Sequence, residues 1–574
     1  MPTSTTTDTA PNSPASVFAT ALLAEFVRSG VTDLVLSPGS RSQALALSAA
    51  QFERAGLLRL RVRVDERSAG FLALGLAVET ARPVLLVVTS GTAVAELHPA
   101  VLEAAHSGVP LIVLSADRPA ELRGIGSNQT TEQHGLFGSA AEKSWDVAAP
   151  GGGGTDADGG SEPLGSEQAA RELVAEVLRG ITGVRHLNLA FREPLSSPQV
   201  LPDVEPGAWR PAPAPVEVRE LQPRPGTVVV AGTEAGEVAE STARALGAPL
   251  LAEVASGARF GPNLVAAYRE VISAGNFGDR VERVVVFGHP TLSREIPGLI
   301  QRDGVETIVV RTPGRDGYNP GHRVSSFVDA VTIADDPAAV EASRGWVGRW
   351  VMASRAILDQ SDDGPGADLS DDLRERADFA RAQLDALRAP VSRGALVRAV
   401  WNASWPHDRL VLASSRLIRE LDRLAPGKKI PVHANRGLAG IDGTIATAIG
   451  IALAQQSGDS GGESARGITR VLLGDLAMLH DAGSLAFGVG ETRPNMQLIV
   501  GNDGGGTIFD GLEVAGTADA AMIDRVLLTP QRVDLSALAA AYGWEYRKVA
   551  TRGELDPALT PSPGQVLIEV PLKR

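Results

Sequence analysis

The feature that most constrains the fold is an alternation that runs through nearly the whole chain. Short runs rich in β-branched residues alternate with longer Ala- and Leu-rich stretches of helical periodicity. This pattern is typical of parallel β-sheets whose strands are joined by crossover helices. The expected strands are Asp33–Leu36, Arg59–Val64, Val84–Thr89, Leu111–Ser115 and His186–Ala190, then Thr227–Ala231, Arg283–Phe287 and Thr307–Arg311, and finally Arg409–Ala413, Arg470–Leu473, Met496–Val500 and Gln565–Val570. The sequence therefore predicts an α/β protein with three doubly wound parallel sheets in series.

The length of 574 residues exceeds what one hydrophobic core supports, so we expect several domains. The predicted domains span residues 16–200, 223–350 and 388–574, and a Pro-rich stretch separates the first from the second. Residues 1–15 are expected to form a disordered tail, because they are polar and lack apolar residues to bury. The Gly-rich insert 151–166 and the segment 456–467 are expected to be solvated loops for the same reason, and residues 373–387 are expected to form a long helix.

Composition excludes several classes of function. The chain has no cysteine, which rules out disulfides, thiolate metal ligands and a cysteine nucleophile. Its net charge of −14 argues against binding to nucleic acid or to anionic membranes. The apolar stretches are too short for membrane insertion, and the N-terminus lacks the basic start and apolar core of a signal peptide. A cytoplasmic enzyme is the expectation.

Two motifs follow predicted strands and point to a cofactor. In the first, a strand leads to Glu66 and the pattern E-x-x-A-G-x-x-A-x-G-L-A, with Thr89-Ser-Gly-Thr further on. In the second, Gly474-Asp475-Leu476 is followed downstream by the glycine-rich segment 501–509. Either alone has a simpler explanation: an acid in a first helical turn is favoured by the helix dipole, and Gly-Asp is common in turns. Together they resemble the family of thiamine-diphosphate-dependent enzymes.

The resemblance implies a pyrimidine-binding first domain and a diphosphate-binding third domain of the thiamine-diphosphate-enzyme type. It implies that Glu66 is catalytic and meets N1′ of the cofactor's aminopyrimidine ring. The other residues implied in cofactor binding are Thr89, Ser90, Gly91, Ile441, Gly474, Asp475, Leu476, Gly505, Ile508 and Phe509. A Mg²⁺ or Mn²⁺ ion would take oxygen ligands, namely the carboxylates of Asp475 and Asp503 and the carbonyl of Gly505. Asn502 remains an alternative to Asp503.

A set of arginine-containing motifs narrows the resemblance within that family. Ser37-Pro-Gly-Ser40-Arg41, Ser115-Ala-Asp-Arg118-Pro, Asn128-Gln129-Thr and Asn435-Arg436-Gly are similar to motifs of carboligases of menaquinone biosynthesis. That similarity implies decarboxylation of 2-oxoglutarate and conjugate addition of the succinyl carbanion to isochorismate. Guanidinium groups bind carboxylates bidentately, so a site that binds these acids needs several arginine side chains. The expected substrate-binding residues are Ser40, Arg41, Arg118, Gln129, Arg294, Ser415, Arg419 and Arg436.

The resemblance also divides this set. Ser415 and Arg419 are expected at the succinyl end, and Arg41, Arg118 and Gln129 at the isochorismate end, whereas Arg294 rests on a looser match. For any single arginine the competing interpretation is a surface ion pair. The competing functions are another 2-oxo acid decarboxylase or carboligase, such as acetohydroxyacid synthase, and a non-catalytic regulatory relative. The family implies a homodimer, or a dimer of dimers, with active sites shared between subunits.

Overall fold

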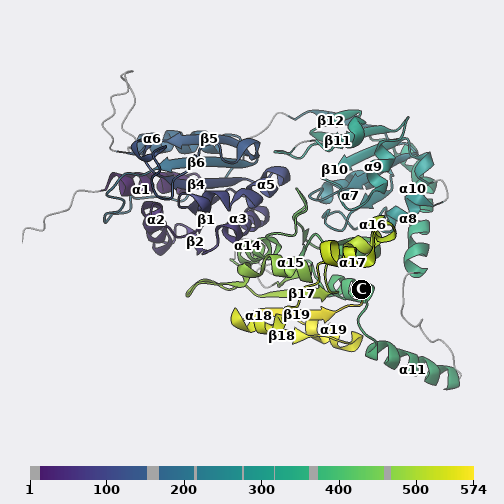
Figure 1. Ribbon diagram of the computed structural model, residues 1–574. Helices are drawn as coiled ribbons and strands as arrows, with labels where there is room; N and C mark the ends of the chain where they lie inside the picture. The colour runs from purple at the N-terminus through teal and green to yellow at the C-terminus, as the bar shows by residue number, and fades with distance from the viewer. Residues whose placement is uncertain are drawn as a thin grey trace, which may run out of the picture. The chain divides into compact units, whose positions relative to one another are not determined.

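The computed structural model describes residues 13–150, 167–211, 216–274, 277–315, 317–360, 373–457 and 467–574. The chain divides into two compact units, Met1–Ala214 with Ala486–Glu491, and Pro215–Leu485 with Thr492–Arg574. Three large sheets, all parallel, form their cores (Figure 1). The predicted α/β fold class is therefore confirmed, while the predicted domain boundaries stay predictions. The first helix begins at Pro14, inside the expected tail; residues 1–12 and the insert 151–166 lie outside the described residues.

The first unit is one six-stranded sheet with helices on both faces. Helices α1, α2 and α6 pack against one another on one face, and α3 packs against α5 on the other. The strand order is β2-β1-β3-β4-β6-β5. The elements are α1 (Pro14–Arg28), β1 (Asp33–Leu36), α2 (Gln43–Arg54), β2 (Arg59–Val62), α3 (Glu66–Thr80), β3 (Val84–Val88), α4 (Thr92–Ala95), α5 (His98–Ser107), β4 (Leu111–Asp117), β5 (Ala141–Val147), α6 (Glu167–Leu178) and β6 (Val184–Ala190).

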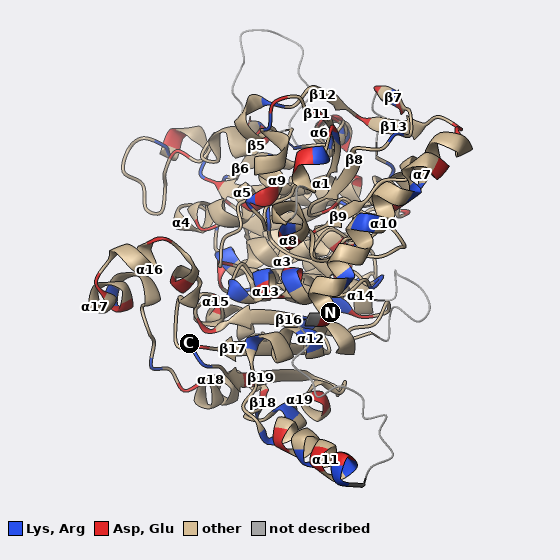
Figure 2. Ribbon diagram, turned by 90° about the vertical axis from the view of Figure 1, so that its right-hand side faces the viewer, with Lys and Arg blue, Asp and Glu red and all other residues tan. Residues whose placement is uncertain are grey.

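The second unit begins with a five-stranded sheet in the order β12-β11-β10-β8-β9 and a two-stranded sheet of β13 and β7. The two-stranded sheet was not predicted. The elements of this part are β7 (Val218–Leu221), β8 (Thr227–Ala231), α7 (Glu237–Leu246), β9 (Leu250–Ala252), α8 (Tyr268–Ser273), β10 (Arg283–Phe287), α9 (Glu295–Ile300), β11 (Glu306–Val310), β12 (Ser326–Val328), β13 (Ala330–Ile333), α10 (Pro337–Gln360) and α11 (Leu373–Arg388). Helix α11, which was predicted, carries basic and acidic residues along its length (Figure 2).

The rest of the second unit is a six-stranded sheet in the order β15-β14-β16-β17-β19-β18. Its elements are α12 (Arg393–Ala403), β14 (Arg409–Leu412), α13 (Arg416–Leu424), β15 (Val432–His433), α14 (Thr444–Gln456), β16 (Thr469–Gly474), α15 (Asp475–His480), β17 (Met496–Asn502), α16 (Val514–Thr517), α17 (Ala520–Ile523), α18 (Leu535–Ala541), β18 (Glu545–Lys548), α19 (Arg552–Leu559) and β19 (Gln565–Pro571). No helix among the described residues is both long and apolar enough to cross a membrane.

Two of the large sheets place predicted site residues at their topological switch points. In the first unit the order reverses between β1 and β3, where the segments 37–41 and 89–91 begin. In the last sheet it reverses between β14 and β16, where Ser415 and Asp475 lie. Ligands of open α/β sheets bind beyond the carboxyl ends of the strands at such points. The topology thus favours the same two regions that the motifs indicated.

Candidate active site

Glu66 is the first residue of α3, directly after the N-cap Asp65. The Asp65 carboxylate accepts a hydrogen bond from the N–H of Arg67 at 3.0 Å, which begins the helix at this point. The Glu66 side chain is half-buried, and Val64 just before it is 87% exposed. An apolar side chain this exposed beside a candidate catalytic carboxylate leaves a surface that a further partner could cover.

The two loops at the switch point of the first unit approach each other closely. A Cβ atom on Gly39 would lie 2.2 Å from Cβ of Thr89, so only glycine fits there. Gly91 has φ 81°, a conformation that L side chains rarely adopt. Thr89 and Ser90 are buried between these glycines. The local backbone therefore fixes the predicted cofactor segment 89–91 against the segment that carries Ser40 and Arg41.

Arg118, Gln129 and Ser90 form one hydrogen-bonded group. The Arg118 guanidinium donates to the Ser90 hydroxyl at 2.7 Å and to the Gln129 carbonyl at 2.6 Å. The Gln129 amide donates in turn to the Ser90 carbonyl at 2.9 Å. The structure thus brings together two predicted substrate residues and one predicted cofactor residue.

Arg41 lies within electrostatic range of this group. Burial, and then the charge of Arg118, lower the pKa of the Arg41 guanidinium. Its Nη1 donates to the Phe191 carbonyl at 3.1 Å. Neither Arg41 nor Arg118 has a carboxylate within 4 Å among the described residues. Glu193 and Asp117 act on Arg41 from beyond ion-pair distance, so the two guanidinium groups keep room for an anionic ligand. Ser40, which is exposed, lies beside Arg41 in sequence.

Sequence reasoning missed a buried polar network that supports this group. Gln133 accepts from the N–H of Gly91 at 2.9 Å and donates to Asn188 at 2.8 Å. Asn188 donates to Asp117, the residue before Arg118, and Ser115 hydrogen-bonds both Asn188 and His186. Burial lowers the pKa of His186 to about 4. Gln133 lies between β4 and β5. The other side chains alternate along β4 and β6 among apolar residues, a period-two pattern that sequence alone attributes to the core.

In the second unit, Asp475 lies within electrostatic range of Asp503. Burial, together with the charge of Asp503, raises the pKa of Asp475 to about 6. The Asp475 carboxylate accepts from the N–H of Leu476 at 2.8 Å. Asn502, the alternative ligand, instead donates to Glu569 at 2.7 Å. The described residues hold no group of three or more His, Asp or Glu side chains around a common point, so a cation here would rest on two carboxylates and backbone oxygen.

The glycine-rich turn after β17 has a backbone conformation and a close backbone contact that require glycine. Gly505 has φ 130°, and a Cβ atom on it would lie 2.1 Å from the Leu528 carbonyl. The following 3₁₀ turn, Thr507–Gly511, contains Ile508 and Phe509, both half-buried. Sequence reasoning missed Arg393, at the start of α12, which donates to Asp503 at 2.9 Å, and Thr507, which also donates to Asp503. Nothing in the sequence around Arg393 marks it.

Ser415 and Arg419 lie together at the start of α13. Ser415 is the N-cap, and its carbonyl accepts from Arg419 Nη1 at 3.3 Å. Burial, and then the charge of Arg269, lower the pKa of Arg419. No carboxylate lies within 4 Å of Arg419 in the part of the chain that the structure describes. Its guanidinium therefore resembles those of Arg41 and Arg118 in lacking a counter-ion.

The remaining predicted residues of the second unit differ in exposure. Arg436 is 3% exposed and donates to Thr291 Oγ1 at 2.9 Å and to Ser414 Oγ at 3.0 Å. Arg294 is exposed, and no ion pair or hydrogen bond of its side chain occurs within the described ranges. Ile441 is 36% exposed, so its side chain does not belong to the buried core. Gly474 lies beside Ser415, because a Cβ atom placed on Gly474 would be 3.7 Å from the Cβ atom of Ser415.

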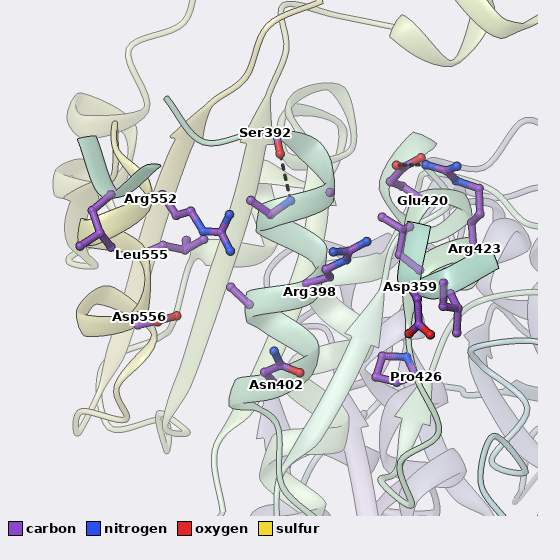
Figure 3. Close-up of a pocket in the computed structure, with 16 residues that line it drawn as sticks. Asp359, Ser392, Arg398, Asn402, Glu420, Arg423, Pro426, Arg552, Leu555 and Asp556 are labelled. Carbon is purple, nitrogen blue, oxygen red and sulfur yellow. Dashed lines mark hydrogen bonds and ion pairs between the residues drawn. The ribbon is translucent and has the colours of Figure 1, made fainter. Parts of the chain in front are cut away.

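The second unit also has a pocket of about 870 Å³ away from these residues (Figure 3). Its lining includes Arg398 and Asn402 of α12, Glu420 and Arg423 of α13, and Arg552 of α19. Arg423 pairs with Glu420 at 2.9 Å, and Asp359 and Asp556 add further acids to the lining. None of the predicted site residues lines this pocket, so we do not assign the chemistry to it.

Comparison with known proteins gives consistent results. The N-terminal TPP-binding domain of thiamine pyrophosphate enzymes matches residues 17–138. A solved benzoylformate decarboxylase from Polynucleobacter necessarius is similar in fold, with a TM-score of 0.63 over 98% of this chain and 99% of that one, at 15% sequence identity. At this identity the likeness shows the fold alone.

Two relatives are similar over nearly their whole length. The 2-succinyl-5-enolpyruvyl-6-hydroxy-3-cyclohexene-1-carboxylate synthase of Leifsonia xyli subsp. xyli is 55% identical over 98% of this chain and 97% of its own. The synthase of the same name from Clavibacter michiganensis subsp. michiganensis is 55% identical over 100% and 98%, and that of Arthrobacter sp. is 42% identical over 94% and 86%. The chain therefore belongs to the family of 2-succinyl-5-enolpyruvyl-6-hydroxy-3-cyclohexene-1-carboxylate synthases.

Proposed function

We propose that this enzyme joins 2-oxoglutarate to isochorismate with release of CO2, and so forms 2-succinyl-5-enolpyruvyl-6-hydroxy-3-cyclohexene-1-carboxylate for menaquinone biosynthesis. The synthases at 55% identity over the full length support this reaction. It makes the enzyme a thiamine-diphosphate-dependent transferase. Acetohydroxyacid synthase or a simple decarboxylase would act on acids with fewer carboxylates.

One observation carries the choice of substrates. Arg41, Arg118 and Arg419 are at least partly buried, yet none has a carboxylate partner within 4 Å among the described residues. A buried guanidinium without a counter-ion is costly, and in a chain of net charge −14 acidic partners are abundant. Each proposed substrate has two carboxylates, and one of the four leaves as CO2. The three that remain through the reaction match these unpaired cations.

The residues present fit the cofactor and its metal ion. Thiamine diphosphate, when bound, supplies the electron sink for decarboxylation. Asp475, Asp503 and the carbonyl of Gly505 would hold a Mg²⁺ or Mn²⁺ ion, since hard cations prefer oxygen ligands, and the ion would supply positive charge for the diphosphate. The closeness of the Asp475 and Asp503 carboxylates to each other and to the turn at Gly505 favours a cation here. Thr89, Ser90, Gly91, Ile441, Gly474, Leu476, Ile508 and Phe509 are the proposed remaining contacts.

The protein side chains have separable tasks in this proposal. Glu66 exchanges a proton with the pyrimidine ring, which requires a carboxyl group in a place that excludes water. Ser415 and Arg419 hold the distal carboxylate of 2-oxoglutarate. Arg41, Arg118, Gln129 and Ser40 hold isochorismate, and the exposed Arg294 and the buried Arg436 supply further positive charge. Fixing both acids in this way converts an encounter of two anions into a reaction within one complex.

The proposed assembly is a homodimer, or a dimer of dimers, in which each active site takes residues from two subunits. Apolar side chains are exposed beside both halves of the site: Val64 is 87% exposed near Glu66, and Leu438 is 51% exposed near Ile441. Exposed apolar surface next to functional residues favours an interface. Such a partner would also exclude water from Glu66.

The experiment that tests the proposed function is an assay of CO2 release. Purified enzyme with thiamine diphosphate and Mg²⁺ is given 2-oxoglutarate with and without isochorismate, and the products are identified by mass spectrometry. We expect fast CO2 release only when both acids are present, in a one-to-one ratio with the three-carboxylate product. Equal release from pyruvate, or acetohydroxy acids as products, would exclude this function in favour of the alternative.

A further inference from the structure

A buried carboxyl group outside the predicted site anchors one of its loops. Glu253 directly follows β9 and is 1% exposed. Its Oε1 accepts hydrogen bonds from the N–H groups of Thr291 at 2.8 Å and Leu292 at 2.6 Å. Its Oε2 has no hydrogen-bond partner among the described residues. Burial, and then the charge of Asp422, raise the pKa of Glu253 above its usual range, and the two accepted hydrogen bonds fix the position of Oε1.

Thr291 connects Glu253 to Arg436 through hydrogen bonds. Its hydroxyl accepts from Arg436 Nε at 2.9 Å, and its carbonyl accepts from Arg436 Nη2 at 3.2 Å. Thr291 therefore receives two hydrogen bonds from the guanidinium while its own N–H is held by Glu253. Since both contacts of Glu253 are to backbone, they set the direction of the Thr291 carbonyl, and with it the plane of the guanidinium.

Hydrogen bonds also connect the segments around Glu253 and Arg436 to α13, the helix that contains Arg419 and has Ser415 as its N-cap. The N–H of Val254, next to Glu253, donates to Asp422 of α13 at 2.7 Å. Arg436 Nη1 donates to Ser414 Oγ at 3.0 Å, one residue before the Ser415 N-cap. These two hydrogen bonds therefore connect the surroundings of Glu253 to α13, where the distal carboxylate of 2-oxoglutarate is proposed to bind.

We propose that Glu253 is a positioning residue for the binding of 2-oxoglutarate: through Thr291 it fixes the guanidinium of Arg436 in the orientation that the 2-oxo acid needs. The inference rests on the proposed function, because it takes the substrate to be a dicarboxylic 2-oxo acid. It assigns a role to Glu253 and Thr291, neither of which touches substrate. A residue that merely stabilised the fold would lower stability and turnover without favouring one substrate.

The first test compares the same substitution at two threonines, the half-buried Thr291 and the buried Thr233. Thr291→Val removes only the hydroxyl that accepts from Arg436. Thr233→Val is the matched control, because the Thr233 hydroxyl is buried, at 3% residue exposure, and has no hydrogen-bond partner among the described residues. We expect Thr291→Val to raise KM for 2-oxoglutarate roughly tenfold, the loss of one charge-assisted hydrogen bond, with KM for isochorismate, kcat and Tm nearly unchanged. Thr233→Val should change none of these.

The second test concerns Glu253 itself. Glu253→Ala leaves two buried N–H groups unpaired and should raise KM for 2-oxoglutarate by more than Thr291→Val does. Glu253→Gln keeps the accepting oxygen without a charge, so it should restore KM to within about twofold of wild type. If Glu253→Ala fails to fold, Thr291→Val still decides the question. A wild-type KM for 2-oxoglutarate in Thr291→Val, or equal shifts in Thr291→Val and Thr233→Val, would overturn the inference. Absence of CO2 release from the wild-type enzyme would instead reject the proposed function.

Discussion

At the scale of single residues, the observed position of Glu66 and its proposed role make different requirements of its surroundings. As the first residue of α3 it lies where the helix dipole stabilises a carboxylate. Proton exchange with a cofactor ring instead requires a carboxyl group shielded from water, and Glu66 is only half-buried. In the proposed assembly, the cofactor and a surface of the second subunit would supply this shielding.

Glu66→Gln tests this role directly. The substitution keeps the size of the side chain and removes its ability to exchange a proton, so turnover should fall on the order of a hundredfold or more. Cofactor affinity and Tm should stay close to wild type. The measurement is the rate at which bound thiamine diphosphate exchanges its C2 proton for deuterium, followed by NMR after acid quench. Exchange at the wild-type rate in the mutant would disprove the assignment.

Asp475→Ala should weaken the binding of Mg²⁺ and of thiamine diphosphate together, each by at least roughly tenfold, because the ion joins protein to phosphate. Isothermal titration calorimetry with each ligand, in the presence and absence of the other, measures this coupling. Asp303→Ala is the control, since the Asp303 side chain is 92% exposed and, among the described residues, pairs only with Arg323 at 3.4 Å. An unchanged cofactor affinity in Asp475→Ala would count against the metal site.

His186 should make the first unit sensitive to acid. Burial lowers the pKa of His186 from 6.5 to about 4, so the folded state holds the neutral ring. A base whose pKa is depressed on folding contributes stability above pH 6.5 that is lost as the pH falls toward 4, on the order of 3 kcal/mol for a shift of this size. His186→Gln should flatten the fall of Tm between pH 6.5 and 4, as measured by differential scanning calorimetry. An unaltered slope would mean that other groups govern acid unfolding.

At the scale of elements, the predictability of a strand depended on its place in the sheet. The central strands β1, β3 and β4 are mostly apolar and buried on both faces, and the sequence predicted them to within two residues. The edge strands β5 and β18 were missed, because their polar, partly exposed side chains lack the apolar run of a buried strand. Strand β15 was missed because it has only two residues.

The same reasoning explains which site residues could be predicted. Residues that follow central strands or belong to glycine-rich turns, such as Asp475 and Gly505, are marked by the strand pattern and by close backbone approaches. Arg393, Gln133 and Thr291 are not, because their partners lie on other elements, 110, 42 and 145 residues away for the contacts with Asp503, Gly91 and Arg436. Single-sequence patterns contain no information about such distant pairings.

Helix α13 offers a test of how the substrate pocket is divided. Arg419→Ala should impair the use of 2-oxoglutarate by roughly tenfold to a hundredfold in kcat/KM, since one charge-assisted contact with the distal carboxylate is lost. Arg118→Ala in the first unit should mainly raise KM for isochorismate. Arg423→Ala, on the same helix as Arg419 but paired with Glu420 at 2.9 Å, is the matched control. Steady-state kinetics with each acid varied in turn would refute the division if the two effects were exchanged.

At the scale of the whole molecule, the fold class could be predicted from alternation alone, whereas the assembly is a prediction that rests only on the family resemblance. The three large parallel sheets follow from local periodicity, which every segment displays independently. The relation between Glu66 in the first unit and Asp475 in the second depends on surfaces that no local pattern encodes. Val64 and Leu438, which are 87% and 51% exposed beside proposed site residues, are consistent with such surfaces.

Mixed dimers test whether one active site takes Glu66 and Asp475 from different subunits. Glu66→Gln and Asp475→Ala chains, each inactive alone, are given different affinity tags, co-expressed, and purified through both tags. In a shared-site dimer, one site of each mixed dimer carries both lesions and the other carries neither, so the doubly tagged dimer should have about half of wild-type activity per dimer. If both residues served one site within one chain, every site would carry a lesion and the dimer would be inactive. Circular dichroism of both single mutants provides the control, because an inactive mixed dimer contradicts the shared site only if both chains are folded.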